Sequence, residues 1–154
     1  MTRFFWLKFF TVALLILVLV PPLIFLLLML LEGMNPGAAL AAVTEQYAGR
    51  RQNPLANTVL GAVAVVPLAL IVLIYRLRKG AAGSTALAFG GGVGIVLTQL
   101  WANLEFWPNF LPGREYPGFP HGLEIVIGSL FFAPVAMLVG VVIAALWLRG
   151  AVQS

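Results

Sequence analysis

The chain has 154 residues, of which 62% are hydrophobic and 9% charged, whereas soluble domains carry roughly 25% charged residues. A soluble domain this apolar would have too few polar side chains to cover its surface, so we expect lipid to be the solvent for much of the chain. The net charge of +4 is small, and the basic residues follow or precede apolar runs, which is typical of topology signals and not of a nucleic-acid surface. No nucleic-acid partner is expected.

The sequence contains no cysteine and a single histidine, His121. Disulfides, thiolate nucleophiles and iron–sulfur clusters are therefore excluded. One histidine leaves little for a metal site, so we expect no metal and no resident cofactor, although a bound lipid, quinone or pigment is compatible with the composition.

The first apolar run covers residues 9–31 and is long enough to cross the roughly 30 Å hydrocarbon core at about 1.5 Å per residue. Arg3 and Lys8 precede it, as in a secretory signal peptide. However, the run exceeds the roughly 7–15 apolar residues of a signal sequence. We therefore expect a retained transmembrane helix.

The segment 32–53 that follows has its own helix signals. Asn35 suits an N-cap, Pro36 suits the first helical position, and Gly49 suits a stop. Three apolar residues fall on one face of this helix: Leu40, Val43 and Tyr47. The pattern predicts a short helix lying on the outer membrane surface.

Three further spans are predicted. The second covers about 54–75, with Asn53 as N-cap and Pro54 next, and is followed by a basic turn at 76–80. The third covers about 81–107 and is stopped by Pro108. The fourth covers about 123–148. The whole chain is thus expected to form one all-α membrane domain, a four-transmembrane-helix bundle.

The loop 108–122 is rich in proline and glycine and is not expected to form a long helix. Aromatic residues near both ends of the spans predict belts at headgroup depth. The expected outer belt is Phe106, Trp107, Phe110, Tyr116 and Phe119. The expected inner belt is Phe4, Phe5, Trp6, Tyr75 and Trp147.

The distribution of charge predicts that both termini are cytoplasmic, an N-in/C-in topology. Six basic residues lie at the ends assigned to the inside: Arg3, Lys8, Arg76, Arg78, Lys79 and Arg149. Three lie outside: Arg50, Arg51 and Arg114. All five acidic residues fall in or beside the outer segments: Glu32, Glu45, Glu105, Glu115 and Glu124. We expect a multi-pass protein of a bacterial inner membrane.

Small residues recur at every fourth position of the third span: Ala82, Ala86, Gly90, Gly94, Thr98 and Ala102. The fourth span carries a shorter series: Ala136, Gly140 and Ala144. Such ridges allow helix backbones to approach closely in lipid, with a right-handed crossing. They serve either packing within the chain or docking of another membrane subunit.

Two polar amides, Gln99 and Asn103, share a face of the third span with Gly92. They either form hydrogen bonds between helices or line a polar cleft for a ligand such as a quinone. His121 and Glu124 are three residues apart at the start of the fourth span. They serve capping and headgroup contact, or form a proton or ligand site.

No ionisable residue falls in the middle of a span, although ion-coupled transporters usually carry one there. Prolines do fall there: Pro21, Pro22, Pro67 and Pro134. No nucleophile motif is present, so catalysis is not favoured. The leading hypothesis is an accessory subunit of a larger inner-membrane complex, binding other integral membrane subunits, lipids or pigments. The alternatives are a small transporter or channel, and an outer-face enzyme acting on a lipid.

Overall fold

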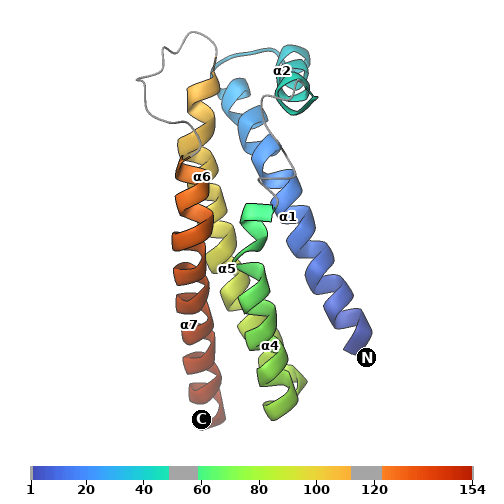
Figure 1. The fold of residues 1–154 in the computed structure, drawn as a ribbon, viewed down its shortest axis with the longest axis vertical. Coiled ribbons are helices and arrows are strands. Elements are labelled where there is room, and N and C mark those ends of the chain that lie inside the picture. The colour runs from blue at the N-terminus through green and yellow to red at the C-terminus, as the bar shows by residue number, and fades with distance from the viewer. Residues whose placement is uncertain (1, 49–58, 112–122, 154) are drawn as a thin grey trace.

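The computed structural model describes residues 2–48, 59–111 and 123–153 (Figure 1). These residues are almost entirely helical and contain no β-strand. Four helical stretches are long and apolar enough to cross a membrane: Phe4–Leu31, Val59–Lys79, Gly83–Phe110 and Leu123–Gly150. The predicted all-helical class and four apolar spans are therefore confirmed. Both ends of the chain lie at the same end of the bundle, beside the turn at Gly80 (Figure 1).

Helix α1 covers Thr2–Leu31 and continues through Pro21 and Pro22. It ends in a Schellman motif, in which the amide of Met34 donates to the carbonyl of Met29 at 3.1 Å. Gly33 adopts a positive φ of 84° at this point, a backbone conformation that glycine reaches without steric cost.

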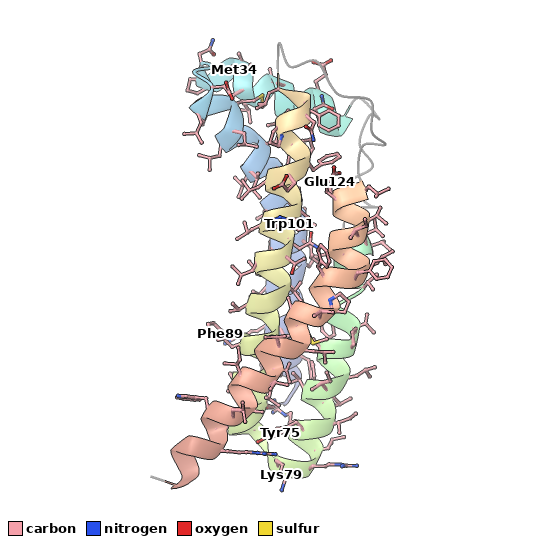
Figure 2. All side chains as sticks on the ribbon, turned by 90° about the vertical axis from the view of Figure 1, so that its left-hand side faces the viewer. Met34, Tyr75, Lys79, Phe89, Trp101 and Glu124 are labelled. Carbon is pink, nitrogen blue, oxygen red and sulfur yellow. The ribbon has the colours of Figure 1, made fainter. Side chains whose placement is uncertain are left out.

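Helix α2 covers Pro36–Ala48 and lies crosswise over one end of the bundle (Figures 1 and 2). The side chain of Asn35 accepts a hydrogen bond from the amide of Ala38 at 2.9 Å, so the predicted N-cap is present. Ala39 is fully buried against the spans while Leu40 is exposed. Gly49, the predicted stop, lies outside the described residues.

The second span is not the continuous helix that the sequence predicts. Residues 59–62 form one turn of helix, Val63 and Ala64 form a turn, and α4 covers Val65–Lys79. Pro67 explains the break, because it has no N–H for the carbonyl of Val63 and its ring would clash with that carbonyl. The helix restarts with Pro67 in its first turn, where a missing N–H costs little. The predicted cap at Asn53 and Pro54 lies outside the described residues.

Helix α5 covers Ala81–Phe106 and is the central element, since it contacts α1, α4 and α7. It follows α4 after the single residue Gly80, whose φ is 95°. The predicted inner turn at 76–80 is therefore shorter than expected, because α4 extends to Lys79. At Pro108 the helix tightens into the 3₁₀ turn η1, Trp107–Phe110.

The fourth span is one continuous helical stretch that contains a π-helical segment. It is built from α6 (Leu123–Ile127), η2 (Gly128–Phe132) and α7 (Ala133–Gln153). The amide of Ala133 donates to the carbonyl of Gly128, five residues earlier. The next residue is Pro134, which donates no backbone hydrogen bond, so the wider turn coincides with the interruption that a proline makes in the helical ladder.

The described charges separate along the bundle axis. Acidic residues lie at the α2 end, namely Glu32, Glu45, Glu105 and Glu124. Basic residues lie at the Gly80 end, namely Lys8, Arg76, Arg78, Lys79 and Arg149. Figure 2 shows Glu124 and Lys79 far apart along this axis.

The predicted outer aromatic belt is wrong for two of its members. Phe106 is 3% exposed and Trp107 is fully buried, in a cluster with Phe25, Met29 and Ala39. The ring of Trp107 stacks on Phe25 with centroids 4.5 Å apart. These rings join α1, α2 and α5 instead of facing headgroups, because α2 lies across this end and covers them. Tyr116 and Phe119 lie outside the described residues.

Candidate functional site

The two series of small residues contact each other along the α5–α7 interface. A methyl group built on Gly94 would overlap the carbonyl oxygen of Ala136. One built on Gly90 would overlap the carbonyl oxygen of Gly140 and lie 2.9 Å from the Cβ of Ala144. Backbone meets backbone here without an intervening side chain, which is the geometry that small residues permit in lipid.

The same interface continues toward the α2 end. A methyl group on Gly128 would lie 2.9 Å from the Cβ of Ala102 and 3.9 Å from the Cγ2 of Thr98. Ala86 is half-buried, and the side chain of Ala82 lies outside what the structure describes. Gly90, Gly94, Thr98 and Ala102 therefore pack within the chain, so these four positions are occupied by α6–α7 and not free for a partner.

Polar side chains form a buried chain of hydrogen bonds along α5. The amide nitrogen Nε2 of Gln99 donates to Oγ of Ser129 in η2 at 3.1 Å. Nδ2 of Asn103 donates to the carbonyl of Gln99 at 2.8 Å. The indole Nε1 of Trp107 donates to Oδ1 of Asn103 at 2.9 Å. We call these four residues the polar ladder; each is at most 6% exposed.

The polar ladder begins where two helix irregularities meet. Ser129 belongs to the π-helical segment η2. On the other side of Gln99, a methyl group on Gly61 would lie 3.5 Å from its Nε2, and Gly61 stands just before the break at Val63 and Ala64. The side chain of Gln99 thus bonds to one irregular span and lies close to the other.

One of the three hydrogen bonds, from Gln99 to Ser129, joins two spans, and the other two lie within the continuous stretch of α5 and η1. A buried amide in lipid needs partners, and Gln99, Asn103 and Ser129 supply them for one another. Gln99 and Asn103 do not line the groove described below, and Gly92, predicted to share their face, has open space where a Cβ would stand. The hydroxyl of Thr98 is satisfied separately by the carbonyl of Gly94 at 3.0 Å.

Glu124 lies in the first turn of α6, half-buried, and its Oε2 is buried without a hydrogen-bond partner among the described residues. Its predicted companion, His121, lies outside the described residues, as does Glu115. Within the described ranges, no group of three or more histidine, aspartate or glutamate residues is placed to hold a metal ion. The outer-face site predicted from His121 and Glu124 thus stays a prediction.

An apolar groove of about 510 Å³ lies between α1 and α5, with α4 at its base. Its walls include Phe9, Val12 and Leu17 on α1 and Phe89, Val93 and Leu97 on α5. Phe89 points away from the bundle in Figure 2 and is 74% exposed. The groove therefore opens toward the surroundings of the bundle, which in a membrane is the lipid.

Sequence reasoning missed Ser129 and Gly61 as neighbours of Gln99. A signal existed, because each stands five or six residues before a midspan proline, Pro134 or Pro67, where the helical ladder must be interrupted. The groove gave no such signal, because it depends on how far α1 stands from α5.

The comparisons with known proteins give no further guide to function. No protein-family model matches the chain, and neither a curated protein nor a solved structure does. The residues and their geometry are therefore the basis for the function proposed below.

Proposed function

We propose that the chain is an accessory subunit of a larger complex in a bacterial inner membrane. In this proposal all four spans cross the bilayer and both termini are cytoplasmic. The separation of charge along the bundle supports this orientation, since basic residues favour the cytoplasmic side. Other integral membrane subunits are its partners.

The observation that carries the proposal is the exposed apolar seam along α1. Leu7, Leu14 and Val18 are between 45% and 64% exposed, and with Thr11 they follow the 4-3-4 spacing of a helix-packing seam. Transmembrane helices associate through packing and not through a hydrophobic force, and most cross at about +20° with coiled-coil-like contacts. A partner helix that follows this seam would fit that geometry.

The interior of the bundle supports the same function. The polar ladder pairs its buried groups with one another, and the small residues of α5 and α7 are packed together. Both features favour a scaffold that holds its shape while its outer surface binds other components.

The test is purification of the tagged full-length protein from its native membrane in a mild detergent. We expect other membrane subunits to co-purify, and we expect Leu14→Trp with Val18→Trp to reduce their yield by tenfold or more. The matched control is Val135→Trp with Val142→Trp, at exposed positions of α7, which should leave the yield unchanged. A wild-type protein that elutes alone would contradict the proposal.

Orientation is tested separately with reporters fused to the C-terminus. We expect a fluorescent protein to be bright there and alkaline phosphatase to be inactive, because both ends of the chain are proposed to be cytoplasmic. The opposite result would overturn the orientation without affecting the helical fold.

A small transporter is the second candidate function. The position of Gln99 favours it, because its side chain lies next to both irregular spans. Interrupted helices near the middle of a membrane are common at the substrate sites of transporters, and here two irregular spans meet at one amide. In liposomes, this alternative predicts a substrate flux that Gln99→Ala or Asn103→Ala abolishes and Val135→Ala preserves. Equal flux through all variants would exclude it.

A further inference from the structure

The groove between α1 and α5 extends over only part of the length of the bundle. On α1 its lining begins at Phe5 and ends at Leu17, and on α5 it begins at Thr85 and ends at Leu97. Each wall is about 18 Å long at about 1.5 Å per residue. This length is close to one leaflet, half of a hydrocarbon core of about 30 Å, and it is too short for a helix that crosses the whole bilayer.

Two cationic side chains stand at the end of the groove nearest Gly80. Lys8 is part of the lining. The guanidinium carbon of Arg76 lies 4.8 Å from the centroid of the Phe5 ring, and Phe5 is also part of the lining. The stacking contact holds the guanidinium over this ring. Thr85 is a polar wall residue near the same end, and the other wall residues named above are apolar, so the groove has one charged end and an apolar length.

We propose that this groove binds an anionic phospholipid, with one acyl chain along the apolar walls and the headgroup phosphate between Lys8 and Arg76. Charge complementarity selects this occupant, because basic pockets between transmembrane helices bind the headgroups of anionic lipids. The length of the walls selects it too, because an acyl chain extends through one leaflet.

The proposed orientation places this charged end at the cytoplasmic leaflet, where anionic lipids attract basic segments. The inference therefore rests on the membrane location and orientation proposed above, but not on the partner subunits. The bound lipid would fill the space that α1 leaves beside α5 and would stabilise the position of α1.

The experiment is native mass spectrometry of the purified full-length protein with dioleoyl phosphatidylglycerol or dioleoyl phosphatidylcholine. The two lipids have the same acyl chains, so only the headgroup differs. We expect the wild-type protein to retain phosphatidylglycerol on the order of tenfold more tightly, since each Lys or Arg contributes a severalfold effect. Equal retention of the two lipids would overturn the proposal.

Two double variants, each of which removes two cationic side chains, test where the headgroup binds. Lys8→Gln with Arg76→Gln should abolish the preference for phosphatidylglycerol. Arg78→Gln with Lys79→Gln removes two exposed cations at the same end that do not line the groove, and it should keep the preference. If both double variants lose the preference for phosphatidylglycerol to the same extent, this end of the bundle attracts anions generally. That result would overturn the proposed headgroup site.

A third variant tests the acyl-chain part with the charges intact. Gly92 lines the groove, and a side chain there would meet no heavy atom within 4 Å of its Cβ, so Gly92→Leu should fold. It should reduce the retention of phosphatidylglycerol severalfold, whereas Gly150→Leu, also in open space on α7, should not. Unchanged retention in Gly92→Leu would place the lipid elsewhere.

The outcomes separate this inference from the proposed function. Selective phosphatidylglycerol binding by a protein that purifies without partners would contradict the accessory-subunit proposal alone. Co-purifying subunits on a protein with no lipid preference would contradict the lipid site alone.

Discussion

The backbones of Gly90 and Gly140 are in direct contact, because a methyl group added to either α-carbon would overlap the carbonyl oxygen of the other. A backbone carbonyl in a helix does not rotate away as a side chain does. Any added atom at this interface therefore forces the two helices apart, which makes the α5–α7 pair the most sensitive packing contact described in the bundle.

Gly94→Ala and Gly92→Ala give a direct comparison within one helix. Both substitutions gain the intrinsic helix propensity of alanine, about 1 kcal/mol. Gly94→Ala also drives a methyl group into the carbonyl of Ala136, and overpacking of this kind costs about 1–3 kcal/mol. We expect the free energy of unfolding in micelles to fall for Gly94→Ala relative to Gly92→Ala, whose Cβ would meet nothing within 4 Å. Equal stabilities would refute the close approach.

The bond between Gln99 and Ser129 is measurable by a double-mutant cycle. Interhelical hydrogen bonds in membrane proteins contribute about 0.6 kcal/mol on average and up to about 1.7 kcal/mol. We expect Gln99→Ala and Ser129→Ala to show a coupling energy in this range when unfolding is followed in micelles. A coupling energy of zero would mean that the 3.1 Å contact contributes nothing to stability.

Asn103→Leu removes the acceptor of the Trp107 indole N–H. Removing the partner of a buried polar group costs about 1–3 kcal/mol, so the thermal stability of the purified protein should fall clearly. Trp107→Phe removes the indole N–H itself. In that background, Asn103→Leu should lower the thermal stability by less than it does in the wild type. The same loss in both backgrounds would show that Asn103 acts through its other bond, to the carbonyl of Gln99.

Gly80→Ala tests the turn between α4 and α5. Gly80 has φ 95° and ψ −172°, a region that is essentially restricted to glycine and costs other residues about 1–3 kcal/mol. No heavy atom lies within 4 Å of the position of an added Cβ, so the loss of stability would come from the backbone alone. The control is Gly150→Ala in α7, which should be neutral or slightly stabilising; a neutral Gly80→Ala would contradict the turn geometry.

Pro67→Ala restores an N–H that the carbonyl of Val63 lacks. We expect the second span to become more continuous, with slower amide hydrogen exchange at residues 63–66 than in the wild type. Pro134→Ala is the companion test for the π-helical segment, where the amide restored at position 134 should also exchange slowly. Unchanged exchange at residues 63–66 would mean that the break at Val63 and Ala64 has another cause.

The features that sequence predicted well depend on local chemistry. Asn35 followed by Pro36 marked the start of α2, since a cap needs only the next three residues. Hydropathy marked the four spans, because each contains a predominantly apolar stretch long enough to cross a membrane. The glycines and alanines of α5 and α7 indicated close packing, although the sequence left open whether the partner lies within the chain.

The features that could not be predicted from the sequence depend on how the helices are arranged in space. Trp107 looked like a belt residue because it lies at the end of a span, but α2 covers that end and Asn103 bonds its indole N–H. The sequence left open whether Gln99 bonds between helices or lines a cleft, because its neighbours, Ser129 and Gly61, are distant in sequence. The prolines that interrupt the second and fourth spans were visible, whereas the form of each interruption was not.

The connection between α1 and α2 has a mechanical consequence. Gly33 lies at the end of α1 and Asn35 caps α2, so the linker between the two helices is too short to extend. With the chain in the membrane as proposed, α1 cannot move along the membrane normal without pulling α2 off the surface. The position of α2 on the surface therefore fixes the depth of α1. A change in bilayer thickness must then be met by tilting of α1, which would widen or narrow its spacing from α5.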